Sequence, residues 1–532
     1  MKDCVRGVRR GVALAFVGLC GFLIAARPAS ATIAYRVSFD QPDRHLFGVT
    51  MSIPVEGTEV TVAIPAWNAL YRIRDFAYRV RDVTALCPSL EPVRASVRKL
   101  DKQTWQIALA SPCQPGDQNT FEIHYSIEWN DPGPFNSQLD SSHAFMNLAE
   151  ILMYVPNRRA EDTSVAFDNV PNGWRTAAEL VPGNAANSYV ASSYDKLVDA
   201  PVESGKFDEF QFHSGGANFR VVVDSNNWNR RELSAGLQRI TDYELHLMGG
   251  APFDAPRREY TFIFHLGPDD DLEGGGMEHA NSTAIAMASV DSAIPIAAHE
   301  FFHVWNVKRI RPQSLEPVDY TKEQYCRSLW FAEGVTSAYA SYTLVRTGLW
   351  STDQFYADLA EQISDLESRP AREWQSAEES SLDAWFEKYD GYNAPARSIS
   401  YYDKGQILGV MLDLAIRDAT GNHKSLDDVL RLMNVEYAQQ GKFYDDDAGI
   451  RAAVEEVAGK SFEDFFRRYV SGTDEIPYNG FLGIAGLQLK SANDREDGLA
   501  LRLGSSYAIT AIQHPTERQR RIREGLLRGT TN

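Results

Sequence analysis

Apolar and polar residues alternate in the first part of the chain. Three runs show this alternation, at 60–64, 105–109 and 121–129. Successive side chains of a strand point to opposite faces, so a two-residue period predicts strands with one buried face. Turn-forming residues separate the runs at short intervals. Residues 32–200 are therefore predicted to form an N-terminal β domain, an antiparallel β-sandwich or saddle-like sheet.

The pattern becomes a mixture of strands and helices after residue 200. Residues 219–223 and 260–266 are predicted strands, and the apolar residues between them recur at helical spacing. Residues 201–350 are therefore predicted to form a mixed α+β lobe. Residues 351–490 read as helical, with a capped helix start at Ser425. The predicted fold class is multidomain α+β.

The first 31 residues have the features of a secretory signal peptide. A basic start, with Arg9 and Arg10, precedes the apolar segment 11–26 and the small residues Ala29-Ser30-Ala31. Export to the periplasm or out of the cell is therefore predicted, with cleavage after Ala31; an uncleaved anchor is the alternative. No later stretch of the sequence is long and apolar enough to span a bilayer, so no stable membrane span is expected after cleavage.

Composition and charge limit the kinds of partner that the chain can have. At 532 residues it exceeds one typical domain, and its 44% hydrophobic content is enough for several cores. The formal net charge is −19, which argues against nucleic acid as a partner because phosphate backbones attract basic surfaces.

The cysteines and the scattered histidines are interpreted as structural residues. Cys87 and Cys113 lie in Pro-containing loops of the β domain and are predicted to form a disulfide, as suits an exported chain. Cys326 is predicted to be a buried free thiol. The histidines of the β domain are unpaired in sequence and are predicted to be surface or core residues rather than ligands: His45, His124 and His143.

The candidate chemistry centres on the sequence His-Glu-Phe-Phe-His at 299–303. On a helix, His299 and His303 lie one turn apart on the same face, where both imidazoles can reach one ion. Zinc binds neutral imidazole readily, and Glu300 lies beside both ligands, placed to accept a proton from a water on that zinc. The alternative is an ordinary buried helix with two hydrogen-bonded histidines.

A third ligand is predicted at Glu333. It is the one charged residue in the apolar and small-residue run 328–340, which reads as a buried helix. A buried carboxylate needs a cation or a hydrogen-bond partner, and one zinc per chain would supply the cation. The alternative is a glutamate at a helix end that reaches solvent.

A glycine-rich turn precedes these segments. Gly274, Gly275 and Gly276 follow the predicted strand 260–266, and glycine lets a ligand's backbone approach closely. Glu278 would then present an anionic group to the cleft. A plain glycine-rich turn is the alternative.

Four short segments, taken together and in this order, resemble the glycyl aminopeptidase family of zinc peptidases. They are Gly-Gly-Met-Glu-His, His-Glu-Phe-Phe-His-Val-Trp-Asn, Trp-Phe-Ala-Glu-Gly and Ser-Tyr-Tyr-Asp-Lys-Gly. The family is similar to the larger alanyl/leucyl aminopeptidase family. Two features depart from that larger family: the longer spacing from His303 to Glu333, and His279 in place of an asparagine.

The resemblance implies a fold and an activity. Residues 201–350 would form a thermolysin-like catalytic domain, 351–490 a helical domain that completes the active site, and 491–532 a partial PDZ-like or disordered tail. The implied enzyme removes N-terminal residues, glycine or alanine first, from peptides with a free N-terminus. Gly275, Gly276 and Glu278 would bind the substrate.

The same resemblance, with the chemistry of a phenol, assigns Tyr402 as the hydrogen-bond donor to the reaction's oxyanion, with its neighbour Tyr401 as the rival. Two other functions stay open. One is a thermolysin-like zinc endopeptidase, and the other is an inactive periplasmic binding or scaffold relative.

Overall fold

The structure is a computed structural model that describes residues 33–529, apart from 56, 69, 89–91, 111–119, 254–256, 268–273, 447 and 492–505. The predicted signal peptide, residues 1–31, lies outside the described residues, as does Cys113. Cys87 is disulfide-bonded, and Cys326 is a buried free thiol as predicted.

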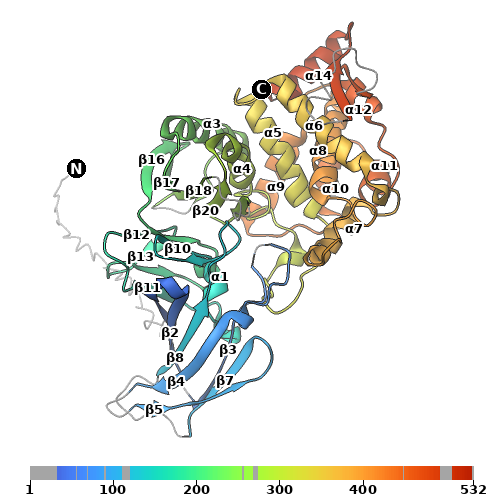
Figure 1. Cartoon of the computed structure of the whole chain (residues 1–532). Helices are drawn as coiled ribbons and strands as arrows, with labels where there is room; N and C mark the ends of the chain where they lie inside the picture. The colour runs from blue at the N-terminus through green and yellow to red at the C-terminus, as the bar shows by residue number, and fades with distance from the viewer. Residues whose placement is uncertain are drawn as a thin grey trace, which may run out of the picture.

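The N-terminal region is built of strands, as the alternating pattern predicts (Figure 1). Its large sheet has the order β13-β14-β11-β1-β2-β8-β4-β5. These strands are β1 (Ile33–Gln41), β2 (Leu46–Pro54), β4 (Val80–Cys87), β5 (Val93–Arg94), β8 (Thr120–Glu128), β11 (Thr163–Asp168), β13 (Val181–Pro182) and β14 (Ser188–Ala191). The sheet is not purely antiparallel, because β1 pairs with β11 in parallel. Side-chain alternation predicts strands but carries no information on their pairing direction.

Two smaller sheets complete this region. One has the order β3-β7-β6, and the other has the order β12-β15-β10-β9. Their strands are β3 (Glu59–Ala63), β6 (Ser96–Lys99), β7 (Thr104–Ala108), β9 (Gln138–Leu139), β10 (His143–Met146), β12 (Arg175–Ala178) and β15 (Val202–Gly205); the short helices α1 (Leu148–Ile151) and α2 (Tyr194–Val198) lie between strands. One hydrophobic core, to which Tyr320 from later in the chain also contributes, holds the region together.

The middle of the chain forms a second, five-stranded sheet with the order β16-β17-β18-β20-β19. Its strands are β16 (Asp208–Ser214), β17 (Ala217–Asp224), β18 (Glu259–Leu266), β19 (Gly275–Glu278) and β20 (Ser282–Met287). Helices α3 (Arg230–Met248) and α4 (Val290–Phe302) pack on one face of this sheet. The predicted helical spacing is confirmed in α3, which buries Leu233, Leu237 and Ile240.

The other face of the five-stranded sheet packs against the four-stranded sheet of the N-terminal region. Side chains of β17, β18 and β20 form a small apolar cluster there with Phe145 of β10 and Ala177 of β12. The alternation along β18 explains this arrangement, because Phe262 and Phe264 face the helices while Ile263 faces the neighbouring sheet.

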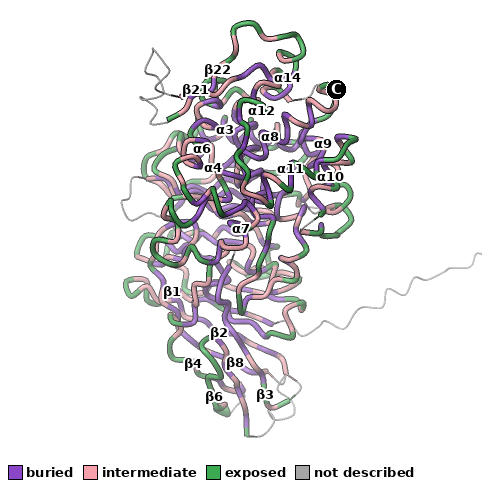
Figure 2. The backbone as a smooth tube through the Cα atoms, turned by 90° about the vertical axis from the view of Figure 1, so that its right-hand side faces the viewer, coloured by how far each residue is buried: buried purple, intermediate pink, exposed green. Residues whose placement is uncertain are grey.

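The remainder of the chain is helical and continues the core of the five-stranded sheet. Its helices are the π-helical segment η5 (Trp330–Val335), α5 (Thr336–Arg346), α6 (Thr352–Ser368), α7 (Ala377–Leu382), α8 (Tyr401–Ala419), α9 (Leu426–Glu436), α10 (Gly449–Ala458), α11 (Glu463–Phe465) and α12 (Tyr478–Ile484). Buried segments are frequent among the helices in the upper part of the molecule (Figure 2), and the buried residues of these helices form one core with those of α3 and α4. The chain is thus a multidomain α+β protein with a β-rich N-terminal region and a helical C-terminal region.

The segment predicted as a partial PDZ-like or disordered tail joins this same core. The described residues form the hairpin β21 (Leu487–Ser491) and β22 (Tyr507–Ala511) and the helix α14 (Glu517–Arg528). Ile522 and Leu526 are buried, and Arg346 of α5 donates a hydrogen bond to Leu526 O at 3.0 Å. The described residues 506–528 thus form a strand of this hairpin and a helix, and apolar residues of α14 are covered by the helical region. None of the helices in the described ranges is long and apolar enough to cross a membrane.

Candidate active site

Helix α4 carries the first two predicted ligands on consecutive turns. Its N-terminus is fixed by Ser289 and Ser292, whose side chains and backbone amides bond reciprocally. Its buried face packs in the large core, so the helix is held firmly against its neighbours. His299 lies in the last turn and His303 is the C-cap, which keeps the one-turn spacing expected from the sequence.

The structure brings the three predicted ligands together. The Nε2 atoms of His299 and His303 lie 2.9 Å apart. Glu333 Oε2 lies 3.1 Å from Nε2 of His303 and 3.5 Å from Nε2 of His299. Residues from two elements thus place two imidazole nitrogens and one carboxylate oxygen around one point.

The hydrogen bonds around these residues fit a bound divalent metal ion. The Nδ1 of His303 lies 2.6 Å from Asn306 O and donates to it, which leaves a lone pair on Nε2 of a neutral ring. In that state the lone pair can bind a metal ion. Without a metal ion, burial would lower the pKa of His303, but Glu333 raises it to about 10, so the ring is then protonated. Burial alone would raise the pKa of Glu333, but His303 and His299 outweigh it and hold this pKa below its usual range, so the carboxylate stays charged. Two imidazoles with one carboxylate match the three-ligand set of catalytic zinc sites.

The π-helical turn η5 and hydrogen bonds from Asn306 hold Glu333 in position. The buried side chain of Asn306 donates to Phe331 O at 2.8 Å and to Thr336 Oγ1 at 3.1 Å. These bonds fasten the segment after α4 to η5, which contains Glu333, and to the start of α5. π-helical turns are rare and occur frequently at functional sites.

Glu300 points its carboxylate into the same space. It is 5% exposed, and its Oε2 has no hydrogen-bond partner among the residues that the structure describes. Burial raises the pKa of Glu300 well above its ordinary value. A buried, unpaired carboxylate with a raised pKa is suited to accept a proton and to hold it.

The edge strand β19 passes directly over Glu300. A Cβ at Gly276 would lie 2.5 Å from Glu300 Oε1, so only glycine lets the strand come this close. Gly275 has a φ of +143°, and a Cβ there would lie 2.9 Å from Phe135 Cζ of the N-terminal region. The two glycines predicted to bind substrate thus let β19 fit between Glu300 and Phe135.

Glu278 ends β19 with a carboxylate that no cation of the described chain neutralises. It is partly exposed, and within the described ranges no Lys or Arg forms an ion pair with it. Burial raises its pKa. The turn that follows is anchored by Asp199, whose Oδ1 lies 3.1 Å from His279 Nδ1 and 2.8 Å from Lys308 Nζ.

The two candidate tyrosines of α8 lie side by side and differ in exposure. Tyr402 is 37% exposed, and its ring centroid lies 6.2 Å from that of His299. Tyr401 is 4% exposed and belongs to the large core. Burial, reinforced by the charge of Glu333, raises the pKa of Tyr402 well above its ordinary value, so the phenol keeps its proton. Geometry therefore favours Tyr402 over Tyr401 as the donor in the cleft.

Comparison with protein families identifies the chain. The model described as M61 glycyl aminopeptidase matches residues 292–408, which include α4, η5 and the start of α8. The model of the peptidase M61 N-terminal domain matches residues 34–206. The chain belongs to the M61 glycyl aminopeptidase family. As a member of this family it is an enzyme, a metallopeptidase of the aminopeptidase type.

A solved structure shares the fold of this M61 chain. The aminopeptidase N family protein from Idiomarina loihiensis is 24% identical, with a TM-score of 0.79, over 86% of this chain and 79% of that chain. An M1 zinc metallopeptidase from Deinococcus radiodurans is 14% identical, with a TM-score of 0.48, over 84% of this chain and 94% of that chain. Comparison with curated protein sequences gave no match.

Several residues beside the M61 site were not predicted from the sequence. Asn306, Asp199 and Phe135 reach it from segments far from Glu333 or Glu278 in the chain. Tyr71 of the N-terminal region also packs against the large core, and the charges of Glu333 and Glu278 add to the effect of burial in raising its pKa. An asparagine directly after the His-Glu motif was visible in the sequence, but nothing in its pattern indicated the carbonyl groups that it binds.

Proposed function

We propose that this M61 enzyme is a zinc-dependent aminopeptidase that removes single N-terminal residues from peptides. The observation that carries the proposal is the convergence of His299, His303 and Glu333 on one point, next to the unpartnered carboxylate of Glu300. The three converging residues would hold the ion. Zinc, when bound there, acts as a Lewis acid and lowers the pKa of water.

Glu300 is proposed as the general base and proton shuttle. Its carboxylate accepts a proton from the attacking water at an oxygen that has no competing hydrogen bond, and then delivers that proton to the leaving amine. The low polarity of its surroundings stabilises the protonated, neutral form. Gly276 keeps the space between β19 and this carboxylate free of a side chain.

Tyr402 is proposed to donate a hydrogen bond to the oxyanion of the tetrahedral intermediate. A phenol held by a helix is a preorganised donor, and such donors stabilise charge that develops in the transition state. The raised pKa of Tyr402 keeps the proton on its oxygen. Tyr401, packed behind it, supports the ring at a centroid distance of 4.7 Å.

Glu278 is proposed to bind the free α-ammonium of the substrate. This ammonium lies one residue from the scissile carbonyl, so its anionic partner must lie near the metal ligands. Glu278 lies on the strand that crosses Glu300, and no cation of the described chain occupies it. A charge-assisted pair in a desolvated cleft is strong and orients the substrate. Preference for glycine rests on the family's description alone, and the extension to alanine rests on the resemblance of the sequence motifs.

We further propose that the chain is exported, since residues 1–31 have the sequence features of a signal peptide. Its partners would then be peptides with free N-termini outside the cytoplasm. The acidic net charge gives no support for nucleic acid as a partner.

Turnover of glycine and alanine amides with free or acetylated amines tests the proposal directly. The native enzyme should contain zinc and should cleave only the free-amine substrates at a useful rate. Glu278→Ala should depress kcat/KM for free-amine substrates by about 100-fold or more, and change hydrolysis of acetylated ones little. Glu373→Ala, at a side chain that is 74% exposed, serves as the surface control.

Equal rates on acetylated and free-amine peptides would instead support the endopeptidase alternative. Absence of zinc together with absence of turnover would support the inactive binding relative.

A further inference from the structure

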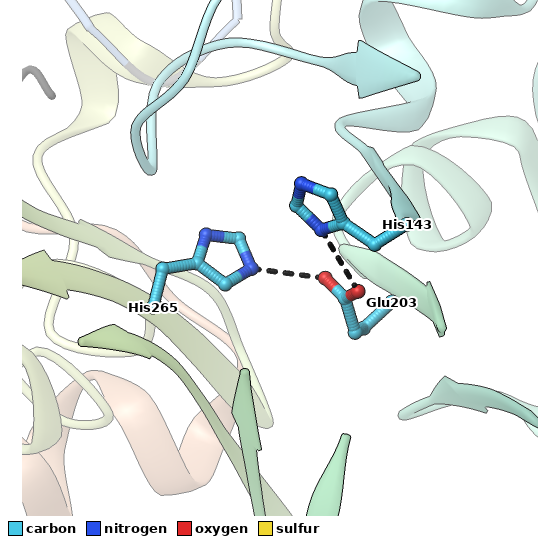
Figure 3. A group of neighbouring side chains, drawn as sticks. All are labelled: His143, Glu203 and His265. Atoms are coloured by element: carbon cyan, nitrogen blue, oxygen red, sulfur yellow. Dashed lines mark hydrogen bonds and ion pairs between the residues drawn. The ribbon is translucent and has the colours of Figure 1, made fainter. Parts of the chain in front are cut away.

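A second group of metal-ligand side chains lies between the two packed sheets, outside the site described above (Figure 3). His143 begins β10, Glu203 lies in β15, and His265 lies near the end of β18. The first two belong to the N-terminal region, and the third belongs to the five-stranded sheet. Their separations in sequence, 60 and 62 residues, left no local pattern by which they could be recognised together.

The three side chains converge because each follows the period of its strand. His265 is two residues after Ile263, so it shares the face that packs against the four-stranded sheet. His143 is two residues before Phe145, which lies on the opposing face. Glu203 is the register partner of Phe145. All three therefore point into the space between the sheets, as the sticks in Figure 3 show.

Distances within the group are short enough for one ion. Glu203 Oε1 lies 3.2 Å from His143 Nδ1, and Glu203 Oε2 lies 2.9 Å from His265 Nε2. Ligand atoms of all three residues lie within 4.8 Å of one another. The two imidazole rings are nearly perpendicular, at 88°, so they approach the carboxylate from different sides.

Asp224 supplies a fourth oxygen. It is the register partner of His265 on the neighbouring parallel strand β17, and its Oδ2 lies 3.3 Å from His143 Nδ1. Its side chain is 38% exposed, whereas that of Glu203 is fully buried. The group is thus closed on the Glu203 side and open to solvent at Asp224. An ion can reach it from solvent on the Asp224 side.

The hydrogen bond on the far side of His143 orients this ring as a ligand. Its Nε2 lies 3.2 Å from Gln138 Oε1, and an amide oxygen can only accept, so Nε2 carries the proton. When the ring is neutral, Nδ1 offers a lone pair to a cation that lies between it and the oxygens of Glu203 and Asp224. Without such a cation, burial would lower the pKa of His143, but Glu203 and Asp224 raise it to about 9, so the ring then carries the positive charge that the carboxylates need.

The charge of the group and the space around it both fit a divalent cation. Two carboxylates carry a charge of −2, which a divalent ion neutralises when the two imidazoles bind it as neutral ligands. Position 205, opposite His143 in the ladder, is glycine, and a Cβ there would lie 3.3 Å from Glu203 Oε1. Phe145 packs edge-on against His265, at a centroid distance of 4.9 Å, and holds that ring in place.

We propose that His143, Glu203, His265 and Asp224 bind a second divalent transition metal ion, of the zinc class, that joins the N-terminal region to the five-stranded sheet. Four protein ligands leave no open position, which is the property of a structural rather than a catalytic zinc site. The histidine that the sequence placed among ordinary surface or core residues is then a ligand. The chain would hold two zinc ions, one more than the sequence predicts.

Zinc content and zinc-dependent thermal stability, measured on the full chain after removal of metal and addition of zinc chloride alone, test the proposal without reference to activity. The native protein should bind two equivalents of zinc, and His299→Ala and His265→Ala should each bind one. In the His299→Ala background, zinc should still raise Tm, because the second site remains. The double variant His299→Ala/His265→Ala should lose both the zinc and this rise in Tm.

His124→Ala, which removes a partly exposed histidine of β8, is the matched control and should keep two equivalents. If His265→Ala fails to fold by circular dichroism, His143→Gln reports on the same site with an amide in place of the ring. One equivalent in the native protein and none in His299→Ala would overturn the proposal and leave the group as a hydrogen-bonded ion network. One equivalent kept by His299→Ala but lost in His265→Ala would uphold the second site and count against the catalytic one.

Discussion

Replacing Gly405 by alanine should separate the two segments that hold Glu333 and Tyr402. Gly405 of α8 lies against Gly334 of η5, and the two backbones touch without an intervening side chain. A Cβ at Gly405 would lie 2.9 Å from Gly334 Cα and would overlap the carbonyl oxygen of Trp330. Both obstructing groups are backbone, so no change of rotamer can relieve the overlap.

The magnitude follows from these distances. Ordinary contact for a Cβ begins at 3.4 Å, so 0.5 Å is the smallest movement that restores contact to Gly334, and the carbonyl oxygen demands more. Overpacking of this kind costs about 1–3 kcal/mol of stability. A misplacement of about 1 Å in an active site can cost about 100-fold in rate. We therefore expect Gly405→Ala to lower kcat/KM for a free-amine substrate by roughly 10- to 100-fold.

The matched control is Gly409→Ala, one turn further along α8 in the same interface. A Cβ there would lie 3.2 Å from Val335 Cγ2 and 3.3 Å from Ala338 Cβ, and the nearest backbone atom, Val335 Cα, would be in ordinary contact at 3.7 Å, so adjustments of a few tenths of an ångström suffice. Its kcat/KM should stay within about threefold of native, since such adjustments cost well under 1 kcal/mol. Steady-state kinetics, zinc content and Tm are measured for both variants. Native kinetics in Gly405→Ala, or an equal loss in Gly409→Ala, would refute the role of this backbone contact.

Three further predictions concern single side chains of the site. Glu300→Gln should keep its zinc and lose at least about 100-fold in kcat, because an amide cannot accept the proton; a kcat near that of the native enzyme would exclude Glu300 as the base. Tyr402→Phe should lower kcat by about two to three orders of magnitude while Tyr401→Phe should not, and the reverse result would move the donor by one residue. Burial would raise the pKa of Asp199, but Lys308 and a side-chain hydrogen bond from His279 hold this pKa below its ordinary value. This stabilisation is therefore present above about pH 4 and is lost as pH falls further. Asp199→Asn should lower the free energy of unfolding by about 1 kcal/mol at pH 7, since the carboxylate is partly exposed. The difference in Tm between this variant and the native protein should become smaller below pH 4. A difference that does not depend on pH would contradict this reasoning.

Local patterns in the sequence were sufficient to predict how residues close together in the chain are arranged. The histidines of α4 share a face because they are four apart, and Glu333 was recognised because a lone charge in an apolar helix needs a cation. The strands of the N-terminal region followed from their alternation. These predictions needed only the period of the helix or strand on which the residues lie.

Contacts between distant segments could not be predicted in the same way. The parallel pairing of β1 with β11, the bonds from Asn306 to the carbonyl of Phe331 and the group around Glu203 all join strands or turns that no spacing rule connects. The π-helical turn at Glu333 is likewise absent from the sequence pattern, since its residues are those of an ordinary buried helix.

The packing of α14 also sets an order of events during synthesis of the protein. Its Ile522 and Leu526 belong to the same core as Ala298 and Phe301 of α4, whereas the core of the N-terminal region draws on the rest of the chain for the buried residue Tyr320. The core of the N-terminal region can therefore be completed once residue 320 has emerged from the ribosome, and the core behind the active site only after residue 526 has emerged. The peptidase is thus kept incomplete while most of its own chain is still being made.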